Sequence, residues 1–120
     1  MKIPASPKRI DILDMRRRLG NDDGLIADLL GMFLEDCGHC LTSIESAVKT
    51  GDLSTVRRRA HSMKGSAANV SAVRVVDAAA ALESSAEHGE VAELDPRLAK
   101  LHVELDELVT ELGGIPPGRS

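Results

Sequence analysis

The prolines of this 120-residue chain are confined to its two ends and to one position in its last quarter. They occupy positions 4, 7, 96, 116 and 117. The long interval from Lys8 to Asp95 therefore lacks the residue that most reliably breaks a helix. The sequence shows no strand-like alternation of apolar and polar residues and no internal repeat. These features predict an all-α protein.

The longest apolar stripe begins after Asn21 and keeps helical spacing. Its members follow one another at steps of three or four residues, which places them on one face of a helix. They are Ile26, Leu30, Phe33, Cys37, Leu41, Ile44 and Val48. Asp22 or Asp23 supplies an N-cap, and Gly51 supplies the left-handed residue that ends the helix. At about 1.5 Å per residue this helix would be about 40 Å long, which is typical of a bundle.

Three further stripes predict the other helices. One helix follows the N-cap Asp52, a second follows Ser71, and a third begins at Pro96 with Asp95 as its N-cap. Their apolar faces are Leu53, Val56, Ala60, Met63, Ala67 and Val70, then Val76, Ala79, Leu82 or Glu83 and Ala86, then Leu98, Leu101, Leu105, Leu108 and Leu112. Short connections favour antiparallel neighbours. A shorter segment, Lys8 to Leu19, is expected to cap one end.

These elements predict one all-α domain, an antiparallel up-down four-helix bundle with a short N-terminal capping helix. We expect the bundle at residues 8–113, with an N-terminal extension at residues 1–7 and a C-terminal tail at residues 114–120. Bundles serve many functions, so the fold class does not identify the chemistry.

The composition disfavours several classes of function. Nucleic-acid modules rely on basic surfaces and aromatic stacking, whereas this chain has a net charge of -4 and 1% aromatic residues. No apolar run approaches the roughly 20 residues of a membrane span, and Met1–Pro7 contains no apolar stretch for a secretory signal. We therefore expect a cytoplasmic protein without nucleic-acid or membrane partners.

His61 is the histidine whose position suggests chemistry. On a helical wheel it lies about 130° from the centre of the apolar stripe, so its imidazole is expected to face solvent. Its neighbours within about 60° are Ser54, Arg57, Arg58, Lys64, Gly65 and Ala68. Glycine costs about 1 kcal/mol in an exposed helix relative to alanine, and at Gly65 it would let a partner approach the ring. We interpret His61 as a phosphoryl acceptor; the alternative is a solvated face without function.

The stretch from Arg59 to Ala72, RAHSMKGSAANVSA, resembles the signature of histidine-containing phosphotransfer (HPt) domains. The family pattern is Ala-His-x-Leu-Lys-Gly-Ser-Ala followed by a short turn. The similarity extends over about residues 10–112. It is also carried by Phe33-Leu34-Glu35-Asp36, Gly51-Asp52, Leu82-Glu83 and Gly89-Glu90.

This resemblance implies a phosphorelay intermediate of two-component signalling. His61 would accept a phosphoryl group from a receiver-domain aspartate or pass one to it, Lys64 would stabilise the phosphate charge, and Gly65 would leave clearance for the receiver. Further contacts with the receiver would come from Arg57, Arg58 and Ala68. The implied partners are response-regulator receivers and a sensor or hybrid histidine kinase.

The same resemblance implies a monomer without a cofactor or metal site of its own, with Mg²⁺ supplied by the receiver. The sequence contains no Gly-rich phosphate loop, so we expect no autonomous kinase activity. Whether such a phosphotransfer protein counts as an enzyme is left open.

Two positions depart from the family pattern. Met63 stands where leucine is usual, which conserves volume in the core. Ser71 stands where the turn after the histidine helix usually has glycine. If this position needs a positive φ, serine is strained there; if it only caps the next helix, serine is well suited.

Two other functions remain as alternatives. A non-catalytic receiver-binding module would keep the family's surface without phosphoryl transfer. A thiol oxidoreductase is suggested by Cys37-Gly38-His39-Cys40, but this motif lies in mid-helix, whereas a reactive C-x-x-C needs a helix N-terminus. We therefore interpret Cys37 and Cys40 as buried thiols. A zinc site from these cysteines and His39 would crowd three ligands into one turn.

Overall fold

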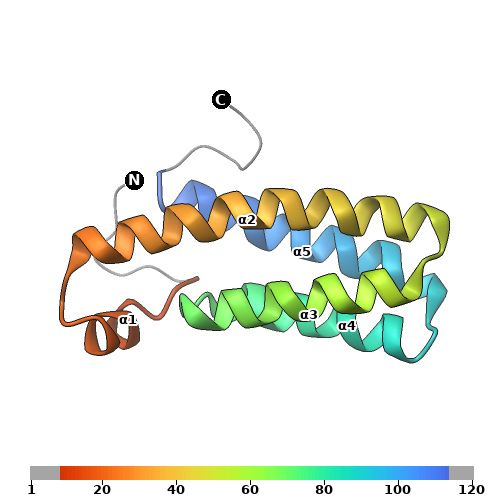
Figure 1. Ribbon diagram of the computed structural model, residues 1–120, viewed down its shortest axis with the longest axis horizontal. Helices are drawn as coiled ribbons and strands as arrows, with labels where there is room; N and C mark the ends of the chain where they lie inside the picture. The colour runs from red at the N-terminus through yellow and green to blue at the C-terminus, as the bar shows by residue number, and fades with distance from the viewer. Residues whose placement is uncertain (1–8, 114–120) are drawn as a thin grey trace.

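The computed structural model describes residues 9–113, and this range folds into five α-helices without strands. They are α1 (Ile12–Arg18), α2 (Asp23–Thr50), α3 (Leu53–Asn69), α4 (Val73–Glu87) and α5 (Val91–Glu111). Helices α2 to α5 form an antiparallel up-down bundle, and α1 lies beside one end of it (Figure 1). The predicted fold class is confirmed. The predicted extension at residues 1–7 and tail at residues 114–120 lie outside the described residues, as does Lys8.

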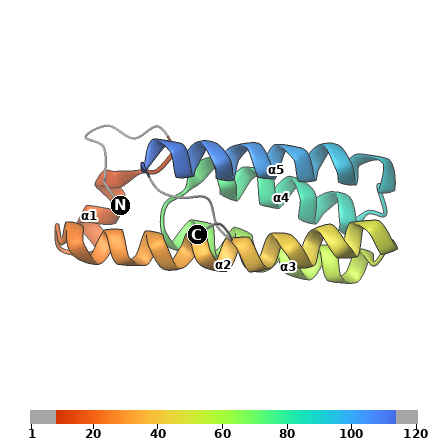
Figure 2. The same cartoon turned by 90° about the horizontal axis from the view of Figure 1, so that it is seen from above.

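The helices of the bundle pack in a ring. Helix α2 contacts α3, α3 contacts α4, α4 contacts α5, and α5 contacts α2. Helices α3 and α5 therefore lie diagonally opposite each other (Figure 2). The longest dimension is 42 Å, which agrees with the length predicted for the long helix. Within the described range, no helix combines the length and apolarity needed to cross a bilayer.

The caps predicted for α2 and α3 are present. The Asp22 side chain accepts a hydrogen bond from the Leu25 backbone N–H at 3.0 Å, and Asp52 accepts one from Thr55 at 3.1 Å. Each bond satisfies one backbone donor that the first turn leaves unpaired. Gly51 ends α2 in the left-handed region, with a φ of 73°.

The start of α5 differs from the prediction. The helix begins at Val91 with Glu90 as N-cap, so Pro96 lies inside the helix and not at its first position. The longer helix buries Leu94, which is 2% exposed, and this burial favours the extra turn. Pro96 cannot donate to the carbonyl of Ala92, but both residues lie on an exposed face, where the missing bond costs less than it would in the core.

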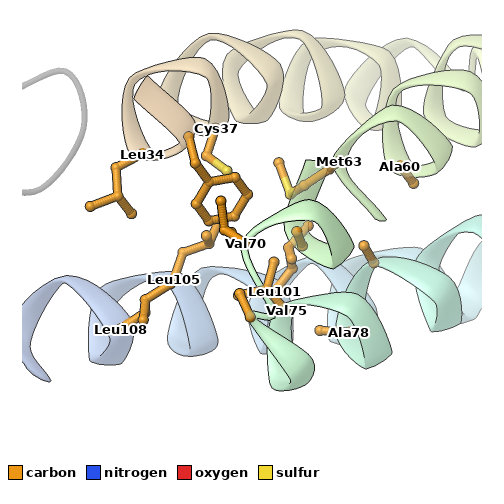
Figure 3. Packing of buried hydrophobic residues seen from close by; sticks show 14 of the residues in the cluster. Leu34, Cys37, Ala60, Met63, Val70, Val75, Ala78, Leu101, Leu105 and Leu108 are labelled. Carbon is orange, nitrogen blue, oxygen red and sulfur yellow. The ribbon is translucent and has the colours of Figure 1, made fainter. Parts of the chain in front are cut away.

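One hydrophobic core fills the bundle (Figure 3). Cys37 of α2, Met63 of α3 and Leu101 and Leu105 of α5 meet in its interior, and all are buried. Met63 is 2% exposed, so methionine occupies a core position, as expected for a volume-conserving replacement.

The buried face of α4 is shifted by one residue near its start. Val75 is fully buried, whereas the predicted Val76 is half-buried. Farther along, Leu82 is buried and Glu83 is half-buried at the edge of this face. Glu83 lies beside α3, where its carboxylate contacts His61 and Lys64.

The turn between α3 and α4 contains Ser71 in the left-handed region, with a φ of 54°. Ser71 does not cap α4, whose N-cap is Ala72, so serine occupies a position that favours glycine. Its hydroxyl donates to Asp14 at 2.7 Å and accepts from Arg18 at 2.8 Å. Its carbonyl accepts from the Asp11 backbone at 2.9 Å. These bonds from α1 offset a conformational cost of about 1–2 kcal/mol.

The two ends of the described range meet at one end of the bundle. The backbone N–H of Arg9 donates to the Glu111 carboxylate at 3.1 Å, and its guanidinium also donates to Glu111 and Glu107. Its Nε lies 3.6 Å from Glu104, a buried carboxylate that is paired with Lys100 at 3.1 Å. Arg9 therefore binds the segment before α1 to the last turns of α5.

Candidate functional site

His61 lies at the middle of α3, on the side facing away from the core. Its side chain is 66% exposed, whereas Ala60, Met63 and Ala67 of the same helix are buried. The outward orientation expected from the helical wheel is confirmed. The imidazole is thus accessible on a convex helical surface.

Glu83 of α4 contacts both His61 and Lys64. Its Oε2 lies 2.7 Å from His61 Nδ1, and its Oε1 accepts from Lys64 Nζ at 2.6 Å. The Glu83 side chain is 15% exposed, so a largely buried carboxylate is shared by two more exposed side chains. An ionised carboxylate only accepts hydrogen bonds, so Nδ1 carries the hydrogen. Nε2 of the neutral ring then has a free lone pair.

The surroundings of Glu83 favour its ionised form. The hydrogen bond from the Lys64 ammonium is the main cause that lowers the pKa of this carboxyl below its ordinary value. Burial acts in the opposite direction, and the hydrogen bond to His61 lowers the pKa further. Glu83 therefore remains an acceptor over the neutral pH range and holds the imidazole in one tautomer.

The other predicted site residues share the exposed side of α3 with His61. Gly65 and Ala68 are exposed, and a Cβ built at Gly65 meets no atom within 4 Å. Arg57 and Arg58 are exposed before His61, and Arg58 donates to Thr55 at 3.3 Å. Of the predicted residues, only Lys64 shares a partner with His61.

Glu83 is the functional residue that sequence reasoning did not assign. It entered as an alternative to Leu82 in the apolar face of its helix and as part of the Leu82-Glu83 segment that carries the family resemblance, without a role of its own. The sequence does contain a signal for the His61–Glu83 contact. A tight turn between two antiparallel helices fixes which residues of the two helices lie opposite each other. His61 and Glu83 both lie eleven residues from Ala72, the N-cap of α4. This symmetry places them opposite each other.

A groove of about 300 Å³ lies between α2 and α3, and both cysteines line it. Cys37 is buried, and Cys40 is half-buried with its Sγ donating to the Arg59 carbonyl at 3.3 Å. Burial is the main cause that raises the pKa of both thiols. Because neither thiol lies at a helix N-terminus, this pair lacks the features of a reactive dithiol.

The structure offers no support for the zinc alternative. Among residues 9–113, no group of three or more His, Cys, Asp or Glu side chains is placed to hold a metal ion. Cys37 also turns into the core, away from the exposed His39.

Comparisons with known proteins agree with this fold. A family model described as Hpt domain matches residues 28–113, a range that includes His61, Lys64 and Glu83. The fold is similar to the crystal structure of histidine-containing phosphotransfer protein B (HptB) from Pseudomonas aeruginosa PAO1, with a TM-score of 0.78 and 24% identity. The match covers 90% of this chain and 94% of that chain. A search of curated proteins gave no match.

Proposed function

The chain belongs to the Hpt domain family of phosphorelay proteins, and we propose that it carries the phosphoryl group on Nε2 of His61. The observation that supports this assignment most directly is the Glu83 contact. It occupies Nδ1 of an exposed imidazole and leaves Nε2 open to a partner.

In the proposed reaction, Nε2 of His61 attacks the phosphorus of an aspartyl phosphate on a receiver domain. The N–P bond forms as the P–O bond to the aspartate breaks, and the aspartate leaves as a carboxylate. The Nδ1 hydrogen stays in its bond to Glu83, so the positive charge that develops on the ring faces a carboxylate. The reverse sequence passes the group to a receiver. Positioning and charge stabilisation are the main contributions to such transfers.

Lys64, Gly65 and the arginines have supporting roles in this proposal. The Lys64 ammonium has three donors, of which one binds Glu83 and the others can bind phosphoryl oxygens. Gly65, one turn after His61, leaves room for the receiver backbone. Arg57 and Arg58 attract the acidic surface of the receiver. Ala68 extends the contact area.

The proposed partners are response-regulator receivers and a sensor or hybrid histidine kinase. The receiver would bring the Mg²⁺ that neutralises phosphate charge. The protein would act as a cytoplasmic monomer. Docking would be transient, because a tightly bound partner would stall the relay.

The proposal is tested by phosphotransfer profiling. Purified protein is mixed for short times with each phosphorylated receiver of the source organism. We expect acid-labile, base-stable phosphate on the wild type, none on His61→Gln, and normal labelling of His39→Gln, which changes another exposed histidine. Circular dichroism should show equal helix content for all three.

The outcomes separate the proposed function from its alternatives. Receiver binding without any phosphate on the wild type would favour the non-catalytic receiver-binding module. Labelling that survives in His61→Gln would place the acceptor elsewhere. A loss of disulfide exchange on replacing Cys37 and Cys40 by serine would instead support the oxidoreductase alternative.

A further inference from the structure

A surface hollow of about 280 Å³ lies where α1 meets the seam between α3 and α4 that also carries His61, and Asp11 and Asp14 contribute to its lining. Its lining includes Ala68 of α3 and Val76 of α4. Ala68 comes seven residues after His61, and Val76 comes seven residues before Glu83. In antiparallel helices both steps run in the same direction, and seven residues return to nearly the same helical face about 10 Å away. The hollow therefore continues the surface that presents His61.

A protein domain that reaches His61 also covers this hollow. Standard specific interfaces bury about 800 Å² on each partner, and weak, transient ones bury up to about 600 Å². A circular footprint of about 600 Å² has a radius of about 14 Å, which exceeds the distance of about 10 Å from His61 to Ala68. The hollow thus lies inside the contact area of the partner.

The free charges on the two sides of His61 have opposite signs. Asp77 lines the hollow and is exposed, and its carboxylate has no ion pair with any residue of the described range, including Arg74 three positions earlier. Of the other lining carboxylates, Asp14 is paired with arginines of α1, whereas Asp11 is exposed and accepts a hydrogen bond from the backbone N–H of Asp14. One turn before His61 the exposed charge is that of Arg57. Val73 beside the hollow is apolar and 47% exposed.

We infer that this hollow receives a basic side chain of the receiver that docks over His61. The aliphatic part of a lysine or arginine fits against Val73 and Val76, and its charge reaches Asp77. The occupant is basic because the open charge of the hollow is negative. Together with Arg57 on the other side of His61, the hollow makes the docking surface bipolar, so the receiver binds in one orientation. This inference rests on the proposed function.

The test measures transfer to Asp77→Lys from the receiver that phosphorylates the wild type fastest in the profiling panel. Asp77 is exposed and unpaired, so the substitution should leave helix content and the unfolding midpoint unchanged. The control is Asp106→Lys, the same charge change on α5, diagonally across the bundle from α3. We expect kcat/KM to fall by about three- to tenfold for Asp77→Lys and to stay within about twofold of wild type for Asp106→Lys.

Changing the salt concentration and substituting basic residues of the receiver test whether the defect of Asp77→Lys arises from charge. The defect should shrink between about 0.05 and 0.3 M salt, because it arises from charge at an exposed rim. One lysine or arginine of the receiver, changed to glutamate, should restore transfer to Asp77→Lys selectively. Wild-type rates for Asp77→Lys would overturn this inference and leave the function of His61 intact. If no receiver labels the wild type, the proposed function and this inference fail together.

Discussion

Replacing Glu83 with alanine is expected to slow phosphoryl transfer to His61 by about fivefold at saturating partner. The Glu83 carboxylate holds Nδ1 at 2.7 Å, which keeps the lone pair on Nε2 and stabilises the charge that develops on the ring. Without it, the imidazole rotates freely and samples both tautomers. The ring remains exposed and reactive, so transfer continues at a lower rate.

The magnitude follows from the exposure of the two partners. Hydrogen bonds to charged groups contribute about 1.5–3 kcal/mol when they are shielded from water. Here Glu83 is 15% exposed but His61 is 66% exposed, so solvent competition reduces the contribution to about 1 kcal/mol. A change of about 1 kcal/mol in the activation free energy corresponds to about fivefold in rate.

Rapid-quench single-turnover transfer from a phosphorylated receiver measures this rate directly. Glu83→Gln should show an intermediate rate, because the amide oxygen still accepts from Nδ1 but carries no charge. Glu87→Ala serves as the matched control, since Glu87 is exposed one turn farther along α4. Equal saturating rates for wild type and Glu83→Ala would refute the positioning role of Glu83.

Two further predictions concern stability, measured by urea unfolding. Ser71→Ala should lower the free energy of unfolding by about 1 kcal/mol through the lost hydroxyl bonds, whereas Ser71→Gly should regain about 1 kcal/mol relative to Ser71→Ala by relieving the positive φ; equal values for both variants would contradict this account. The Ser71 hydroxyl is the main cause that lowers the pKa of Asp14 in the folded protein. The stability that this hydrogen bond contributes is therefore present above the unfolded pKa of aspartate, about 3.9, and is lost as the pH falls through the lower folded pKa of Asp14. Arg9→Met should lower the free energy of unfolding by about 2 kcal/mol. The substitution leaves Glu104, which is 5% exposed, with Lys100 as its only charged partner in the described range. The control Arg97→Met removes only an exposed pair and should cost less than about 0.5 kcal/mol, so similar losses for both arginines would argue against the buried-pair explanation.

The helices of the bundle were predictable because local patterns determine them. The apolar stripes, the caps Asp22 and Asp52 and the turn at Gly51 all act within a few residues of chain. The outward orientation of His61 follows from the same periodicity. The start of α5 was not predictable in this way, because the burial of Leu94 in the tertiary structure outweighs the usual preference of Pro96 for a first turn.

The interactions between helices were largely beyond sequence reasoning. The Glu83 contact depends on the register of α4 against α3, and the bonds to Ser71 depend on the docking of α1. Arg9 finds its partners in α5, about one hundred residues away along the chain. Periodicity identifies which side of a helix is buried, but it does not specify which polar groups meet across an interface.

The joining of Arg9 to Glu111 has an architectural consequence. The two ends of the described range therefore lie together at one end of the bundle. Under the proposed function, His61 on the helix diagonal to α5 would stay accessible to successive receiver domains.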